Sequence, residues 1–163
     1  MNDFERTLVK SFNESFEESG TLALAYRLKQ HRFSSQLIDV LVDSGNKDLY
    51  LGIECKSISV DKGASALYFK QHFTVDKQGV HQIERISEFL RQTGRKGFLA
   101  VELRMGAGHS RQAFFVPWAV VEKKFRENVK ISVEEIKTHS QLARRGKTYG
   151  VNHLFEPLKR RIN

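Results

Sequence analysis

The 163-residue sequence contains a single cysteine, Cys55, and no long hydrophobic run. One cysteine excludes an internal disulfide and fits a reducing compartment. The six histidines are scattered, and with one cysteine they form no zinc-binding spacing. The longest apolar run, AFFVPWAVV at 113–121, is far shorter than the roughly 18 residues that span a membrane. The opening MNDFERTLVK is polar and unlike a signal peptide, so we expect a cytoplasmic protein without a membrane partner.

Basic residues outnumber acidic ones and are concentrated near the C-terminal end. The net charge is +8 and the isoelectric point is about 9.7. Residues 137–163 hold seven basic residues against one acid, Glu156, which gives this segment a net charge of +6. A basic patch favours a polyanionic partner such as nucleic acid, because neutralised phosphates release their counterions. The alternative is that the charge only keeps the protein soluble.

Hydrophobic periodicity predicts one α/β domain whose central mixed sheet has five strands and is flanked by helices. Phe4, Leu8, Phe12 and Phe16 recur every four residues and indicate a first helix over 3–19. The expected strands are 22–28, 36–43, 48–58, 97–104 and 112–120, and the further helices are 76–93, 119–127 and 133–139. Residues 59–75 give no clear pattern, although LYFKQHF at 67–73 suits either base stacking or a partly buried segment.

Two charged residues stand inside an otherwise apolar predicted strand, in YLGIECKS at 50–57. Alternate side chains of a strand share a face, so Glu54 and Lys56 point the same way. The residues of opposite phase, Leu51, Ile53 and Cys55, form an apolar face that should pack against a helix. A carboxylate and an ammonium group are therefore expected together on the other face of the sheet.

An acid of the preceding strand, Asp39, is expected beside this pair. The turn Ser44-Gly45-Asn46 predicts a hairpin, which brings Asp39 near Glu54. Two carboxylates brought together repel each other unless a cation holds them, and Mg²⁺ suits oxygen ligands. With Lys56 to stabilise charge on a phosphate, the arrangement predicts metal-dependent phosphodiester hydrolysis.

The acid-x-lysine pattern is weak evidence by itself. It occurs three times, beginning at Glu54, Glu122 and Glu135, and the last two fall in predicted helices, where residues two apart do not face each other. Only the first lies in an apolar strand with an acid on a neighbouring strand. For that pair the alternative is a surface ion pair. Cys55 faces away from the carboxylates, so we interpret it as a packing residue and not as a nucleophile.

The pattern Asp39…Glu54-x-Lys56 resembles the PD-(D/E)xK nuclease signature. In the order of its elements, the chain from residue 3 to residue 121 resembles the Holliday junction resolvases, both the archaeal type and the bacterial RecU type. The segments that carry the resemblance are FERTLVKSF at 4–12, AYR at 25–27, SSQLID at 34–39, HQIERISEFLRQTGRKGFLAVEL at 81–103 and ISVEEIK at 131–137. The resemblance implies a restriction-endonuclease-like nuclease domain over 1–136, with 137–163 as a basic extension packed on it or trailing from it. The activity it implies is that of a Mg²⁺-dependent endonuclease that resolves four-way DNA junctions.

The resemblance also implies roles for individual residues. Asp39 and Glu54 would bind Mg²⁺, which Mn²⁺ is expected to replace, and Glu5 would complete the metal site from the first helix. Lys56 would be the catalytic lysine. Without the resemblance, Glu5 is equally well explained as an acid favoured by the helix dipole.

Further residues are expected to contact the DNA. They are Arg6, Arg27, Arg32, Ser35, Lys62, Lys70 and Gln82. By the resemblance, Arg6 and Arg27 would hold phosphates, and Ser35, or Ser34 in its place, would approach the scissile strand. For the arginines and lysines the alternative is an ordinary exposed residue.

Three features depart from the family pattern. Ile38 stands where the signature has proline, the loop 29–35 is longer than in the archaeal type, and the RecU-type stalk is absent. The resemblance implies branched DNA as the partner and a homodimer, because two matched cuts suit a two-fold assembly. The alternatives are another nuclease of this class, restriction-like or for repair, or a DNA-binding module that has lost catalysis.

Overall fold

The computed structural model describes residues 3–29 and 37–154. The strands are β1 (Ala23–Arg27), β2 (Val40–Ser44), β3 (Leu51–Ser59), β4 (Ala66–Tyr68), β5 (Lys96–Arg104), β6 (Gln112–Pro117), β7 (Lys130–Ser132), β8 (Ser140–Arg145) and β9 (Thr148–Gly150). The α-helices are α1 (Asp3–Ser19), α2 (Phe69–His72), α3 (Gln82–Thr93), α4 (Trp118–Glu127) and α5 (Val133–Ile136). Short 3-10 helices are η1 (Lys47–Leu49), η2 (Val60–Lys62) and η3 (Asn152–Leu154).

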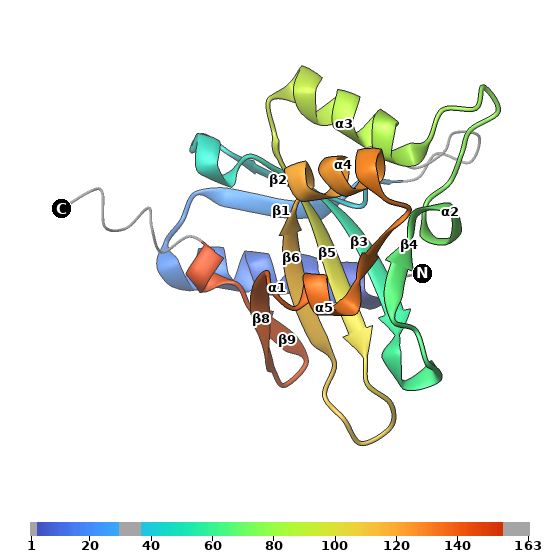
Figure 1. The fold of residues 1–163 in the computed structure, drawn as a ribbon. Coiled ribbons are helices and arrows are strands. Elements are labelled where there is room, and N and C mark those ends of the chain that lie inside the picture. Colours follow the sequence, from blue (N-terminus) through green and yellow to red (C-terminus); the bar gives the residue numbers. More distant parts are fainter. Residues whose placement is uncertain (1–2, 30–36, 155–163) are drawn as a thin grey trace.

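The main sheet has seven strands in the order β1-β2-β3-β5-β6-β8-β9 (Figure 1). The pair β3–β5 is parallel and the other neighbours are antiparallel. The prediction of five strands is therefore wrong, because β8 and β9 extend the sheet beyond β6. Their pattern is hard to recognise, since Leu142 is the only buried residue of the six in β8. The predicted boundary after residue 136 remains a prediction, although β8 and β9 join the same sheet as the earlier strands.

Helices cover both faces of this sheet (Figure 1). On one face, the predicted phenylalanine and leucine stripe of α1 packs in a buried cluster that includes Leu51, Ile53 and Cys55 of β3. The prediction that these three residues pack against a helix is confirmed. On the other face, α3 and α4 enclose a second cluster, and the two-stranded sheet of β4 and β7 lies beside it.

Helix α3 begins later than its apolar spacing predicts. The predicted helix started at residue 76, but Asp76 instead forms a turn in which its Oδ1 accepts from the backbone N–H groups of Gln78 and Val80, at 2.9 Å each. Gly79 has φ of 82°, which a helix does not allow. The helix starts at Gln82, with the His81 side chain accepting from the Ile83 N–H as a cap. As a result, Gln82 is the first residue of α3.

The described residues contain no helix long and apolar enough to cross a membrane. The segment LYFKQHF forms β4 and α2, and its Phe69 and Phe73 are buried. These two rings therefore belong to the core and do not offer a surface for base stacking.

Candidate active site

The hairpin of β2 and β3 brings Asp39 beside the strand that carries Glu54. Val40 pairs with Ile53, so Asp39, one residue before β2, lies level with Glu54. The Asp39 Oδ2 atom accepts a hydrogen bond from the Cys55 N–H at 2.8 Å. This bond fixes the Asp39 carboxyl against β3, and the side chain is almost fully buried.

Glu54 is the most deeply buried acid of the candidate site, with 2% of its surface exposed. Its Oε1 atom lies 3.0 Å from Lys56 Nζ and accepts a hydrogen bond from Gln82 Nε2, also at 3.0 Å. Its Oε2 atom is buried and has no hydrogen-bond partner among the described residues. The carboxyl is thus held through one oxygen and leaves the other available.

The Lys56 ammonium group is held between Glu54 and an aromatic ring. Its Nζ lies 4.6 Å from the centroid of the Phe73 ring, close enough for a cation–π contact. Sequence reasoning missed Phe73 in this role, because the residue lies 17 positions away in a segment without clear periodicity. The LYFKQHF motif indicates that aromatic rings are present in this segment, but it does not indicate which ring contacts Lys56.

The carboxyl groups of Asp39 and Glu54 are neighbours, and burial raises the pKa of both. Burial raises the pKa of Asp39 to about 6, although the Cys55 N–H bond opposes the shift. Burial also raises the pKa of Glu54 to about 8, and the neighbouring Asp39 charge adds to this, while Lys56 acts in the opposite direction. Two adjacent buried acids of this kind are typical of a site that holds a shared proton or a cation.

Glu5 lies at the edge of the same site but has its own partner. It is buried on α1, and its Oε2 atom accepts from Arg27 Nε at 3.0 Å and lies 2.8 Å from Arg27 Nη2. Its charge nevertheless contributes to raising the pKa of Asp39, so Glu5 lies on the Asp39 side of the site. Arg27, predicted to bind phosphate, is placed by β1 at this edge with about a third of its side chain exposed.

The donor set fits a hard divalent cation in part. Asp39 and Glu54 offer adjacent carboxylate oxygens, and Glu54 Oε2 is a buried oxygen without a partner. Mg²⁺ is bound through one or two carboxylates and retains water for its other positions. Within residues 3–29 and 37–154, no three histidine, cysteine or acidic groups converge as a metal-binding cluster. Glu5 would therefore have to loosen its pairing with Arg27 to become a third ligand.

The remaining predicted residues fall into three groups. Gln82 lies inside the site, where it donates to Glu54 and accepts from the Thr74 N–H at 3.2 Å. Arg6, Lys62 and Lys70 are exposed on α1, η2 and α2 respectively. Arg32 and the serine pair 34–35 lie outside the described residues.

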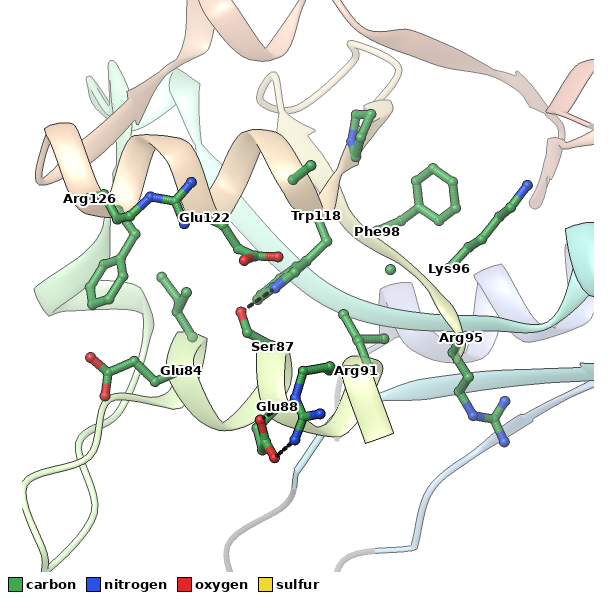
Figure 2. Close-up of a pocket in the computed structure, with 16 residues that line it drawn as sticks. Glu84, Ser87, Glu88, Arg91, Arg95, Lys96, Phe98, Trp118, Glu122 and Arg126 are labelled. Carbon is green, nitrogen blue, oxygen red and sulfur yellow. Dashed lines mark hydrogen bonds and ion pairs between the residues drawn. The ribbon is translucent and has the colours of Figure 1, made fainter. Parts of the chain in front are cut away.

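A large cavity lies elsewhere, between α3, α4 and the start of β5 (Figure 2). Its volume is about 840 Å³, and Trp118, which donates to Ser87 at 3.0 Å, forms part of its wall. None of the predicted site residues that the structure describes lines this cavity. The carboxyl groups of Asp39 and Glu54 and the Lys56 ammonium group therefore lie apart from this cavity.

No protein-family model matches the sequence, and no curated protein matches it. The structure is similar to that of Hjc from Archaeoglobus fulgidus, a Holliday junction resolvase from an archaeal hyperthermophile. The TM-score is 0.54 and the sequence identity 20%, and the similarity covers 85% of this chain and 91% of that chain. The predicted resemblance is confirmed at the level of the fold: the chain has the restriction-endonuclease-like arrangement of a mixed sheet flanked by helices.

Proposed function

We propose that this protein is a Mg²⁺-dependent DNA endonuclease that resolves four-way junctions. The observation that carries the proposal is the contact set of Glu54, which combines a buried neighbouring acid, a lysine at 3.0 Å and an oxygen without a hydrogen-bond partner. A fold shared with a Holliday junction resolvase supports the choice of substrate. Mn²⁺ is expected to replace Mg²⁺.

Asp39 and Glu54 would hold the cation, with Glu5 as a supporting carboxylate. When bound, the cation would supply Lewis-acid activation of water and partial neutralisation of the phosphate. Lys56 would stabilise the negative charge that develops on the phosphate. Gln82 would keep the Glu54 carboxyl in one orientation through its hydrogen bond, and the same amide is itself fixed by the Thr74 N–H.

Arg27 and Arg6 would bind the DNA backbone beside the cut. Arg27 is partly exposed although it pairs with Glu5, so it can meet a phosphate without leaving the site. Backbone contacts carry no sequence information, and the preference for a junction would therefore rest on shape. Arg32 is proposed to contact the DNA, and Ser35, or Ser34 in its place, to approach the scissile strand.

The decisive experiment is cleavage of a labelled four-way junction beside a linear duplex of the same sequence. We expect the wild type to cut only the junction in Mg²⁺ and to be inactive in EDTA. Lys56→Ala should lower the rate by about 10²–10³-fold, as expected on removing a group that stabilises transition-state charge. Lys47→Ala is the matched control, because Lys47 is exposed on η1 at the other end of β3, and it should retain full activity.

Each other result points to a different function. Equal cutting of junction and duplex would exclude a junction resolvase and leave a nuclease of another kind. Sequence-specific cutting of the duplex would favour a restriction-like enzyme. Binding of the junction without any cutting would leave a DNA-binding module on this fold.

A further inference from the structure

Three turns with basic side chains meet at one end of the main sheet. Ser59 of β3 pairs with Arg104 of β5, so η2 and the turn from β5 to β6 leave the sheet at the same end. Ala113 of β6 pairs with Leu142, and β8 then runs toward that end before turning into β9. Figure 1 shows the β5–β6 and β8–β9 turns side by side at this end of the sheet.

A cavity of about 310 Å³ opens between the first two of these turns. Lys62 of η2 and Arg104, His109 and Arg111 of the β5–β6 hairpin line it, together with one acid, Asp61. The side chains of Lys62, Arg104 and His109 are exposed. The cavity is therefore positively charged and open to a ligand.

The basic groups of this cavity differ in whether they already have partners. Arg111 lies 3.2 Å from the buried Glu102 and 3.7 Å from Asp3, so its charge is largely matched. Among the described residues, Lys62 and Arg104 form no ion pair. Many other basic side chains of the protein do have an acidic partner, as Lys96 has in Asp48 and Lys124 in Glu135. Two unmatched cations on one cavity suit an anionic ligand.

The same end of the sheet carries the candidate active site. Lys56 and Ser59 are three residues apart on β3, which corresponds to about 10 Å along the strand, and their side chains point to opposite faces of the sheet. Asp39 and Arg27 also lie at this end, because β2 starts there and β1 finishes there.

Further basic residues extend the charge beyond the cavity. Arg144, Arg145 and Lys147 stand exposed at the β8–β9 turn, which belongs to the segment with the net charge of +6. The Arg144 guanidinium lies 4.8 Å from the centroid of the Tyr149 ring, so it is supported on the hairpin. These residues add exposed positive charge at the same end of the sheet as the cavity.

We propose that the cavity between η2 and the β5–β6 turn binds a backbone phosphate of the DNA through Lys62, Arg104 and His109. The β8–β9 turn continues this contact along the same arm of the DNA. The inference rests on the proposed DNA substrate, but it concerns binding and does not require that the protein cuts.

The test is the salt dependence of junction binding, measured by fluorescence anisotropy in EDTA so that no strand is cut. The test variant is Lys62→Ala/Arg104→Ala. The control is Lys47→Ala/Lys123→Ala, which removes the same charge from exposed residues of η1 and α4. Both variants change exposed side chains, and their melting temperatures should equal that of the wild type.

Each phosphate contact contributes about 0.9 to the slope of log affinity against log salt on duplex DNA. We expect the test variant to lose about 1.8 from this slope, Arg104→Ala alone to lose about half as much, and the control to keep the wild-type slope. Equal losses in test and control would overturn the inference, since only net charge would then matter. A wild type that binds no DNA would overturn it as well. A wild type that binds with these slopes but never cuts would refute only the nuclease proposal.

Discussion

At the scale of single residues, the most informative side chain is Glu54. Lys56 and Gln82 both contact one of its oxygens, and the other oxygen is buried without a hydrogen-bond partner among the described residues. Asp39 stands next to it, so the pair of carboxyl groups is unfavourable when both are ionised and no cation is bound. Burial, and after it the neighbouring Asp39 charge, raise the pKa of Glu54 to about 8.

The raised pKa of Glu54 predicts how the stability of the metal-free protein, measured in EDTA, depends on pH. Between the ordinary pKa of 4.5 and the raised value of about 8, the folded protein holds a proton on Glu54 that the unfolded chain has lost. The contribution of Glu54 to the free energy of unfolding should therefore be largest below pH 4.5. It should be lost as the pH rises through about 8. Glu54→Gln removes this titration, so its stability should fall less between pH 5 and pH 9.

Chemical denaturation across that pH range measures the effect. Only the slope against pH is diagnostic, because the substitution also weakens the contact with Lys56. Glu127→Gln is the control, since Glu127 is exposed at the end of α4, and its profile should run parallel to that of the wild type. Parallel profiles for Glu54→Gln and the wild type would show that Glu54 ionises normally in the folded protein.

At the scale of elements, the C-terminal hairpin holds α1 against the sheet. The Ser11 side chain on α1 accepts from the Tyr149 N–H at 2.9 Å, and the Tyr149 hydroxyl donates to the buried Glu102 Oε2 at 2.7 Å. Arg111 contacts the other oxygen of Glu102. Since α1 also carries Glu5, this network connects the hairpin to the helix that borders the candidate site.

Tyr149→Phe should destabilise the protein by about 1–3 kcal/mol, because Glu102 Oε2 would be left buried without its donor. Urea unfolding measures this loss. Tyr68→Phe is the matched control, since Tyr68 is exposed on β4 and should show no change beyond about 0.5 kcal/mol. A Tyr149→Phe protein as stable as the wild type would mean that this hydroxyl contributes nothing to the attachment of the hairpin.

The elements also differ in how well the sequence predicts them. The α1 stripe recurs every four residues, and the helix has the predicted bounds of Asp3 and Ser19. The apolar spacing of α3 begins at Val80, but the helix itself starts only at Gln82. The Asp76 side chain accepts hydrogen bonds from the backbone N–H groups of Gln78 and Val80, so residues 76–80 form a turn and not the first turn of the helix. Strand β8 has too few apolar residues to be recognised, and it forms because β6 offers an unpaired edge.

At the scale of the whole molecule, resolving a junction requires two matched cuts, for which we propose a homodimer. Light scattering should give a mass about twice that of the 18.8 kDa chain. Mixing wild type with an excess of Lys56→Ala should produce junctions nicked on one strand, because a mixed dimer carries one intact site.

The same mixing with Lys47→Ala is the control and should leave paired cuts unchanged. A protein that stays monomeric with and without DNA would contradict the dimer, as would paired cuts that persist at every ratio of wild type to Lys56→Ala.

The sequence by itself determined the amphipathic first helix, the apolar face of β3 and the placement of Asp39 beside the strand that carries Glu54 and Lys56. These features depend on residues only a few positions apart, so the periodicity of apolar residues along a helix or strand predicts them. Only the tertiary structure decided that Glu54 is buried against Gln82, that Glu5 pairs with Arg27, and that the basic segment supplies two strands of the main sheet. Each of these contacts is made between residues that are distant in the sequence. They depend on how the elements pack and exclude water, and a local sequence pattern carries no information about that.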